Sequence, residues 1–279
     1  NWQDKARNIR AIAGELSLGL DAMVLVDDNP AERALVRHLL PEVAVPELPA
    51  DPALYARTLL AAGYFETVAF SAEDRNRAAF YQENARRALL QQESGDMDAY
   101  LASLDMVLTV QPFDAAGRAR IAQLIGKSNQ FNLTTRRYTE AEVAEAERDP
   151  ACFTLQARLS DRFGDNGMIA VVICLPAGRD CEVDTWLVSC RVLGRRVENA
   201  VLQEILVHAR RAGTERIIGV YRPTARNALV KDHYAKLGFA LVDTKPDGTT
   251  TWELAVARAP AEAAPMTIKR RGGRAPDGA

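Results

Sequence analysis

Apolar residues recur at two different spacings along this chain, and the change between the two spacings predicts its elements. Residues 6–16 place four apolar side chains on one helical face. Residues 23–26 form a short apolar run, residues 31–40 a second helix, and residues 43–46 another short run. Strand, helix and strand in this order predict part of a Rossmann-like parallel sheet over the first 50 residues.

Residues 51–104 have a different pattern, in which helical periodicity and frequent charges predominate. A long amphipathic stretch covers residues 73–92, and the polar residues 93–96 interrupt it. We interpret residues 51–104 as a helical connector between two domains.

A second α/β domain is predicted over residues 105–257, where short apolar runs alternate with helical patterns and turn signals. The expected strands are residues 106–113, 153–159, 168–174, 181–190, 216–221, 239–242 and 250–255. Residues 258–279 are rich in Ala, Pro, Gly and Arg without periodicity, which predicts a disordered tail. The chain begins without Met, and we expect it to be the C-terminal part of something longer.

The composition of the chain argues against several classes of function. The 279 residues include 35 basic and 37 acidic side chains, and the net charge of −2 argues against a nucleic-acid or membrane-surface binder. No apolar run approaches the roughly 18 residues that span a bilayer. Four cysteines without a CxxC pair favour a reducing, cytoplasmic location, and the three scattered histidines suggest no zinc site.

The strongest local signal lies at residues 186–197, where a buried strand ends at Cys190 and a helix follows. Such a turn presents backbone N–H groups at a helix N-terminus, which attracts anions. Gly194 allows close approach of a phosphate, and three arginines add positive charge: Arg191, Arg195 and Arg196. The spacing resembles the acyl-CoA pyrophosphate loop of the GNAT (N-acetyltransferase) fold. Arg196 replaces the usual small residue, which favours the single phosphate of a carrier-protein phosphopantetheine over CoA; an ordinary strand-to-helix turn remains the alternative.

A second motif follows about 30 residues later. Asn227, Tyr234, Gly238 and Phe239 have the spacing of the second GNAT signature. The resemblance implies that Asn227 helps to bind the thioester and that Tyr234 lies beside its sulfur. His233 is a candidate base. The alternatives are core aromatic residues and a surface histidine.

Cys190 itself has two possible roles. Positive charge and a helix N-terminus lower the pKa of a thiol, and the thiolate is then able to accept an acyl group as a covalent intermediate. A buried structural cysteine is the alternative.

Near the N-terminus, Asp27 and Asp28 end a predicted parallel strand, where carboxylates are well placed for Mg²⁺. Lys5 precedes them by one helix and one strand, so all three could share a phosphate site. The pattern resembles the last two motifs of haloacid dehalogenase (HAD)-type phosphatases. The chain has no D-x-D-x-T/V nucleophile motif, so we expect no phosphatase activity from it.

Taken together, long segments resemble the FkbH-like family, in which a HAD-like part is fused to a GNAT-like domain. These segments are residues 1–9, 26–33, 127–138, 159–167 and 186–198. The resemblance implies glyceryl transfer from 1,3-bisphosphoglycerate to the phosphopantetheine of an acyl carrier protein. Four polar residues are candidates to line the acyl pocket or, alternatively, to cap a helix: Asn129, Gln130, Asn132 and Arg136.

Two other functions remain open. One is an acetyl-CoA-dependent N-acetyltransferase, in which Glu182 or Asp184 would serve as base and Cys190 would be incidental. The other is a non-enzymatic module that only docks a carrier protein.

Overall fold

The computed structural model describes residues 3–16, 18–66, 77–128, 131–259 and 264–272, without the side chains of 77–81. The chain forms two compact units, Asn1–Tyr81 and Gln82–Ala279. In the described ranges, no helix has both the length and the apolar character needed to cross a membrane.

The first unit is built from helices around a small core. They are α1 (Lys5–Leu16), α2 (Pro30–Leu39) and α3 (Tyr55–Ala61), with short 3₁₀ turns at Leu20–Ala22 and Pro52–Leu54. The N-cap of α2 is Asn29, whose side chain accepts a hydrogen bond from Ala31 N, and Pro30 occupies the first turn. The two predicted strands are reduced to one parallel bridge, Val24↔Ala44, so the described residues show no extended sheet in this unit.

The second unit contains a sheet with the strand order β6-β7-β5-β4-β3-β2-β1-β8. The strands are β1 (Val107–Gln111), β2 (Phe153–Asp161), β3 (Gly164–Ala177), β4 (Asp180–Val188), β5 (Arg216–Tyr221), β6 (Ala240–Thr244), β7 (Thr250–Ala255) and β8 (Thr267–Arg270). Neighbouring strands are antiparallel except β4–β5 and β1–β8, which are parallel. The expected α/β class is therefore present as a mixed sheet.

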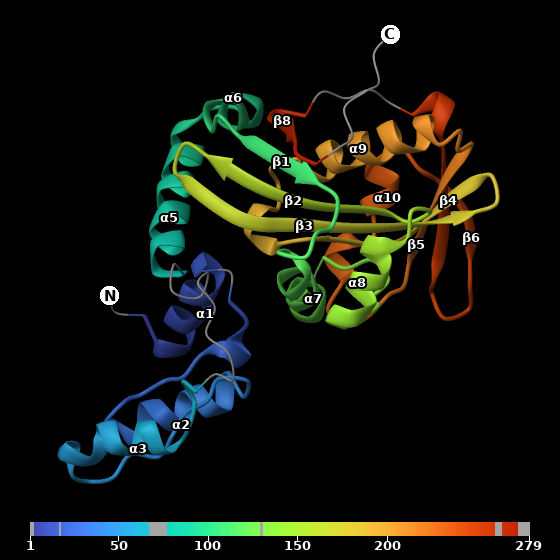
Figure 1. The fold of residues 1–279 in the computed structure, drawn as a ribbon. Coiled ribbons are helices and arrows are strands. Elements are labelled where there is room, and N and C mark those ends of the chain that lie inside the picture. The colour runs from blue at the N-terminus through green and yellow to red at the C-terminus, as the bar shows by residue number, and fades with distance from the viewer. Residues whose placement is uncertain (1–2, 17, 67–76, 129–130, 260–263, 273–279) are drawn as a thin grey trace. The chain divides into compact units, whose positions relative to one another are not determined.

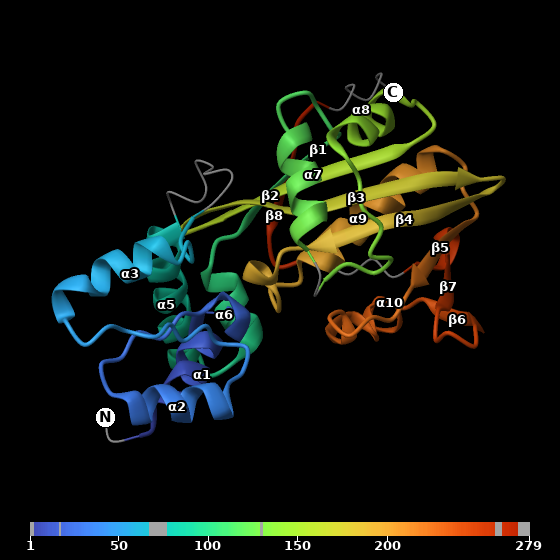
Figure 2. The same ribbon diagram turned by 90° about the horizontal axis from the view of Figure 1, so that it is seen from below.

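Helices cover both faces of this sheet (Figures 1 and 2). Helix α9 (Val197–Arg211) lies on one face, and α7 (Arg118–Lys127) and α8 (Glu140–Arg148) lie on the other. Strand β3 is consequently buried on both sides: Val172 joins the core under α9, and Val171 joins the core under α7. A continuous apolar run is typical of such a central strand.

The predicted connector is divided between the two units. Helix α5 (Arg77–Glu93) crosses the division at Tyr81, and α6 (Met97–Ser103) lies wholly in the second unit. Tyr100 and Leu101 of α6 belong to the large core of the second unit. Residues 82–104 are therefore part of the α/β unit.

The predicted disordered tail requires a correction. Thr267–Arg270 forms strand β8, which pairs with β1 in parallel. The guanidinium of Arg270 donates two hydrogen bonds to the carboxylate of Glu204 on α9, at 2.9 and 2.7 Å. Pairing with β1 and with the buried carboxylate of Glu204 orders this segment, and neither contact can be predicted from local composition.

Candidate functional site

The parallel pair β4–β5 is joined over only part of its length. Their pairing runs from Asp180↔Arg216 to Val183↔Gly219, and the rest of β4 has no partner in β5. Where two parallel strands part, the backbone groups of both become available to a third segment.

Residues 131–134 supply that third segment. Asn132 forms an antiparallel bridge with Leu187 of β4, and the carbonyl of Leu133 accepts a hydrogen bond from the backbone N–H of Arg222, just after β5, at 2.9 Å. Thr134 Oγ1 donates to the backbone carbonyl of Asp184 at 2.8 Å. The segment thus contacts both strands at the point where they separate.

The side chain of Asp184 anchors three residues: Arg136, Tyr138 and Thr185. Tyr138 Oη donates to its carboxylate at 2.5 Å, Thr185 Oγ1 at 3.0 Å, and Arg136 forms an ion pair with it. The guanidinium of Arg136 also lies 4.8 Å from the centre of the Tyr138 ring. Burial, followed by the Asp184 contacts, raises the pKa of Tyr138. Arg136, predicted for the acyl pocket, and Asp184, a candidate base in the alternative function, are both engaged in this anchoring.

A buried aromatic cluster lies beside the segment. The His233 ring is 4.6 Å from the Trp186 ring, 5.4 Å from that of Tyr234 and 5.0 Å from that of Phe131, all centre to centre. Each of the four residues is at most 6% exposed.

Several polar atoms of this region have no hydrogen-bond partner among the described residues. They are Trp186 Nε1, His233 Nε2 and Asn132 Nδ2. Asn132 Oδ1, by contrast, accepts a hydrogen bond from Thr135 N at 2.9 Å. Since buried polar groups are nearly always paired, such a group of unpaired atoms is typical of a place that receives water or a ligand.

Burial also sets the charge states of these side chains. It lowers the pKa of His233 to about 3, with a further contribution from Lys236. It raises the pKa of Tyr234 far above its ordinary value, even though the Val220 backbone lowers it somewhat. Both side chains are neutral at physiological pH. A histidine with so low a pKa is a weak base, which argues against the predicted role of His233 as a base.

Tyr234 lies directly against β5 because that strand has a glycine at the contact. A Cβ on Gly219 would overlap the Tyr234 ring, with Cδ1 at only 2.8 Å. The predicted thioester residue Asn227 is fully buried: its Nδ2 donates to the carbonyls of Asn132 at 3.1 Å and Arg222 at 2.9 Å. In this structure Asn227 therefore joins residues 131–134 to the turn after β5.

Cys190 lies at the end of β4 and is exposed. It begins a 3₁₀ turn, Cys190–Val192, whose N-cap Ser189 accepts hydrogen bonds from Arg191 N and Nε, at 3.5 and 3.1 Å. We refer to residues 190–196 as the Cys190 turn.

The rest of the Cys190 turn leads into helix α9 through two left-handed residues. Gly194 has φ +77° with open space around its Cβ position, and Arg196 has φ +56°. Arg196 is the N-cap of α9 and makes no side-chain capping bond. The turn thus leads to the positive end of a 15-residue helix, whose first turn also carries Glu198, and anion binding here stays a prediction.

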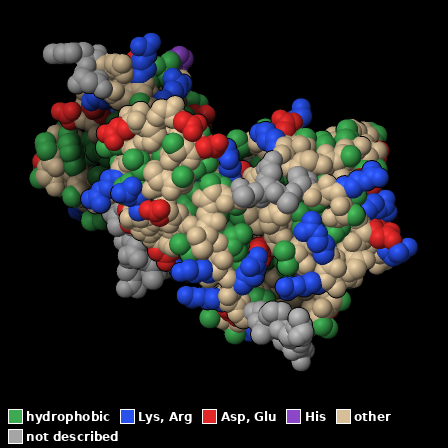
Figure 3. Space-filling view, turned by 90° about the horizontal axis from the view of Figure 1, so that it is seen from above, with side chains coloured by type: hydrophobic (Ala, Val, Ile, Leu, Met, Phe, Trp, Pro, Cys, Tyr) green, Lys and Arg blue, Asp and Glu red, His purple; other side chains and the backbone are tan. Residues whose placement is uncertain are grey.

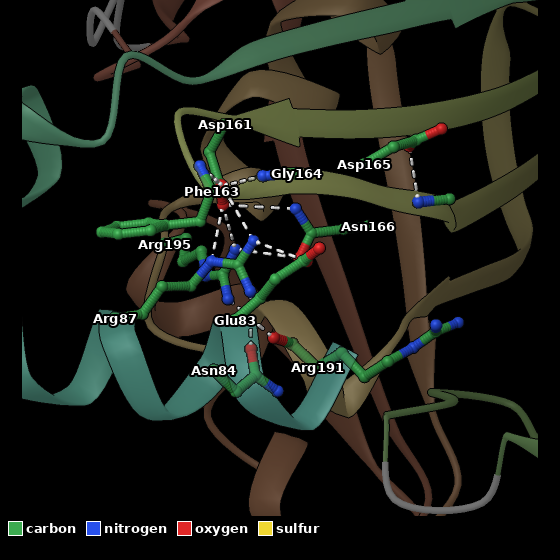
Figure 4. Close-up of polar contacts among 11 residues, drawn as sticks. Glu83, Asn84, Arg87, Asp161, Phe163, Gly164, Asp165, Asn166, Arg191 and Arg195 are labelled. Carbon is green, nitrogen blue, oxygen red and sulfur yellow. Dashed lines mark hydrogen bonds and ion pairs between the residues drawn. The ribbon is translucent and has the colours of Figure 1, made fainter. Parts of the chain in front are cut away.

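The three arginines of the turn differ in their surroundings. Arg196 is about half exposed and forms an ion pair with Asp98 at 2.5 Å. Arg195 is buried and donates to Asp161 Oδ2 at 3.0 Å and to Asn166 Oδ1 at 3.2 Å. Arg195 therefore points into the protein (Figure 4), where Asp161 offsets the positive charge that was predicted to attract a phosphate.

A groove of about 150 Å³ lies between α9 and α10 (His233–Lys236). Asn199, Leu202 and Gln203 line it from α9, and residues 235–238 line it from the other side. It begins within the first turn of α9, close in sequence to the Cys190 turn. Figure 3 shows one face of the molecule, where Lys and Arg side chains exceed Asp and Glu over its right-hand part.

In the first unit, the structure brings Lys5 and Asp27 together in an ion pair. Asp27 is buried and its carboxylate also accepts a hydrogen bond from Asn29 N at 2.9 Å, while Asp28 is exposed. No group of three His, Cys, Asp or Glu side chains in the described ranges is arranged to hold a metal ion. Mg²⁺ is commonly held by one or two carboxylates together with water and substrate phosphate, and here one of the two carboxylates is paired with Lys5, so the predicted Mg²⁺ site stays a prediction.

The remaining predicted acyl-pocket residues, Asn129 and Gln130, lie outside the described residues. The sequence analysis assigned no role to Trp186, Asp161 or Gly219. A glycine in a strand pattern is a signal of close approach by a neighbour, and that signal marks Gly219.

No protein-family model and no curated protein matches the chain. Among solved structures, the ribosomal-protein-S18-alanine N-acetyltransferase from Escherichia coli is 14% identical, covers 56% of this chain and 98% of its own, and has a TM-score of 0.41. The GNAT domain of S. lividans PAT is 21% identical and covers 52% of this chain and 89% of its own, with a TM-score of 0.42.

A different solved structure is similar at higher identity over a shorter stretch. It is the N-terminal part of a Bacteroides fragilis protein that contains a phosphatase domain, complexed with Mg. It is 51% identical over 25% of this chain, with a TM-score of 0.24, and this chain spans 19% of its length. TM-scores as low as these three do not establish a shared fold.

Proposed function

We propose that the second unit is an acyltransferase that moves an acyl group, through Cys190, to the phosphopantetheine thiol of an acyl carrier protein. Following the FkbH-like resemblance, the acyl group is glyceryl and its donor is 1,3-bisphosphoglycerate. Both GNAT-like motifs support the proposal, since they lie at the ends of the same pair of parting strands: the Cys190 turn follows β4, and Asn227 follows β5.

The unpaired polar atoms of the aromatic cluster carry the proposal. An unpaired buried polar atom costs about 1–3 kcal/mol, and Trp186 Nε1 and His233 Nε2 incur this cost in one cluster of rings. A ligand that bonds to these atoms would offset the cost. An acetyl group offers only its carbonyl oxygen, whereas a glyceryl group offers a carbonyl and two hydroxyls. The cluster therefore favours a hydroxylated acyl group.

The chemistry proceeds in two displacements. The Cys190 thiolate attacks the carbonyl carbon of the acyl phosphate; a C–S bond forms, the C–O bond to phosphate breaks, and phosphate leaves with the electron pair. The pantetheine thiolate then attacks the thioester, a new C–S bond forms, and Cys190 leaves as a thiolate. Tyr234, which stays protonated, donates a hydrogen bond to an acyl or sulfur atom in this scheme, and neutral His233 accepts or donates one.

The second candidate is an acetyl-CoA-dependent N-acetyltransferase. The groove between α9 and α10 favours it, because the groove begins in the first turn of α9, shortly after the Cys190 turn in sequence, and could give an extended cofactor room beyond the phosphate. One observation weighs against it. The carboxylate of Asp184, a candidate base for this reaction, is occupied by Arg136 and Tyr138.

Loading of Cys190 tests the proposal without the phosphorylated donor, because thioester exchange is reversible. Incubated with glyceryl-S-pantetheine phosphate, the chain is expected to gain one glyceryl mass, sensitive to hydroxylamine and located at Cys190 by peptide mapping. Acetyl-CoA is expected to load more weakly.

The matched control is Cys152→Ser. Burial raises the pKa of Cys152 to about 11, so this thiol is expected to stay unloaded and its replacement to leave loading unchanged. Loading that survives Cys190→Ala, or transfer of acetyl to an amine at full rate in that variant, would overturn the proposal in favour of direct transfer.

A further inference from the structure

The carboxylate of Asp161, at the end of β2, is fully buried and accepts hydrogen bonds from five residues (Figure 4). Two come from backbone N–H groups of the β2–β3 turn, Phe163 at 2.9 Å and Gly164 at 3.2 Å. The others come from the side chains of Arg87, Asn166 and Arg195. We call Arg87, Asp161, Asn166 and Arg195 the Asp161 cluster.

One side of this cluster contacts the Cys190 turn. Arg195 Nη1 donates to Asp161, and its Nη2 donates to the backbone carbonyl of Arg191 at 3.1 Å. The same guanidinium thus joins Asp161 to the first residues after Cys190. With Arg195 held inward, the backbone from Arg191 to Arg195 is closed into a fixed loop around its own side chain.

The other side of the cluster belongs to helix α5. Arg87 Nε and Nη2 donate to the two oxygens of Asp161, each at 2.8 Å, in the bidentate geometry that favours arginine over lysine. Asn84 Oδ1 accepts from Arg87 Nη1 at 2.9 Å, and Glu83 lies 3.4 Å from Nη2. Only 3% of the Arg87 side chain is exposed.

The charges of the cluster depend on one another. Burial raises the pKa of Asp161, but hydrogen bonds from Arg87 and Phe163 and the charge of Arg87 outweigh burial, so the net pKa is lowered. Burial and repulsion by Arg87 lower the pKa of Arg195, and Asp161 opposes them. Asp161 is thus the shared anion between two buried cations, and losing Arg87 changes how tightly it holds Arg195.

We propose that Arg87 and Asp161 are positioning residues for phosphate binding: they fix Arg195, and through it the Cys190 turn, in the shape that receives the phosphate of pantetheine or CoA. The inference rests on the proposed function, because the turn must be the phosphate site. It assigns to α5, a helix that crosses the division between the two units, a part in the thioester site of the second unit.

The test compares ligands with and without a phosphate on Arg87→Met and Arg87→Lys variants. Binding of CoA and of pantetheine is measured by calorimetry, with circular dichroism as the check of fold. Arg87→Met is expected to weaken CoA about tenfold, because a turn that is no longer held in shape loses the equivalent of about one charge-assisted contact to the phosphate. Pantetheine, which has no phosphate, should stay within about twofold. Arg87→Lys is expected to restore part of the affinity because it keeps the charge without the bidentate fork.

Arg158→Ala is the matched control, since Arg158 pairs with Asp165 on the same hairpin at 3.1 Å but both side chains are about half exposed. It is expected to change neither affinity. Equal loss of CoA and pantetheine in the Arg87 variants, or unchanged CoA binding with an intact fold, would overturn the inference. Should Arg87→Met fail to fold, Arg87→Lys decides by the same comparison. A wild-type chain that binds neither ligand would instead overturn the proposed function, and the inference with it.

Discussion

Replacing Gly219 by alanine tests the closest packing contact of the candidate site. A Cβ at this position overlaps the Tyr234 ring, which is 1% exposed and lies between the Phe239 ring at 5.0 Å and the Trp252 ring at 6.4 Å. Because the overlap is with a buried ring, the ring, the strand or the α10 turn must shift. Gly219→Ala should therefore lower both the stability of the second unit and its affinity for a ligand at the candidate site.

The expected size follows from two opposing effects. Overpacking a core costs about 1–3 kcal/mol, and losing glycine's backbone freedom in a strand returns about 0.5–1 kcal/mol. The net expectation for Gly219→Ala is a destabilisation of about 1–2 kcal/mol. Gly126→Ala is the control: this exposed glycine near the end of α7 has nothing within 4 Å of its Cβ position, and the same change there should stabilise by up to about 1 kcal/mol.

The assay is urea unfolding followed by tryptophan fluorescence in a Trp2→Phe background, so that the signal comes from Trp186 and Trp252, which lie in the second unit. A double-mutant cycle with Tyr234→Leu adds a sharper criterion. Since the clash requires the ring, the cost of Gly219→Ala should largely disappear in the Tyr234→Leu background. A Gly219→Ala protein as stable as wild type, or an additive cycle, would refute this reasoning.

Three further outcomes are expected. Asp161→Asn should destabilise the second unit by about 3–5 kcal/mol at neutral pH, since it removes the carboxylate shared by two buried arginines and leaves Glu83, 3.4 Å from Arg87, to offset their charge. Because the folded pKa of Asp161 is lowered, this stabilisation is present above about pH 3.9 and is lost as the pH falls through the folded pKa. The unfolding curves of variant and wild type should therefore converge in acid. Arg270→Ala should lower the free energy of unfolding by about 1–3 kcal/mol, because it removes both hydrogen bonds to buried Glu204, and it should speed tryptic cleavage at Lys269. The control Arg216→Ala, at an exposed pair with Asp180, should lower it by at most about 1 kcal/mol. The chain should release no phosphate from p-nitrophenyl phosphate with Mg²⁺; turnover that disappears in an Asp27→Asn/Asp28→Asn double variant would contradict this.

Sequence periodicity predicts the central elements of the second unit because local composition determines them. The apolar run at residues 168–174 forms the middle of β3, and the helix predicted to follow the strand that ends at Cys190 is α9, which begins at Val197. Strand β8 escapes prediction because its order comes from β1 and from Glu204, 66 residues before Arg270.

For the candidate site too, the features set by local sequence were predictable, and those set by distant residues were not. Its turn residues carry local signals: Gly194 has the positive φ that a close phosphate approach would use, and Cys190 is exposed at the end of its strand. The inward orientation of Arg195 depends on Asp161 and Asn166, which precede it by 34 and 29 residues. No pattern within the turn distinguishes an arginine that meets a ligand from one that meets a buried carboxylate.

The pairing of β1 with β8 has a consequence for how the second unit is made. Val107 pairs with Thr267, which lies 160 residues further along the chain. Strand β1 is therefore synthesised long before the strand with which it pairs. During synthesis β1 is an edge strand with unsatisfied N–H and C=O groups, open to pairing with other chains. Contacts of such long sequence separation also slow folding. Chains that end before Thr267 should therefore fold into a sheet with an uncovered edge, and aggregation should fall sharply once β8 is included.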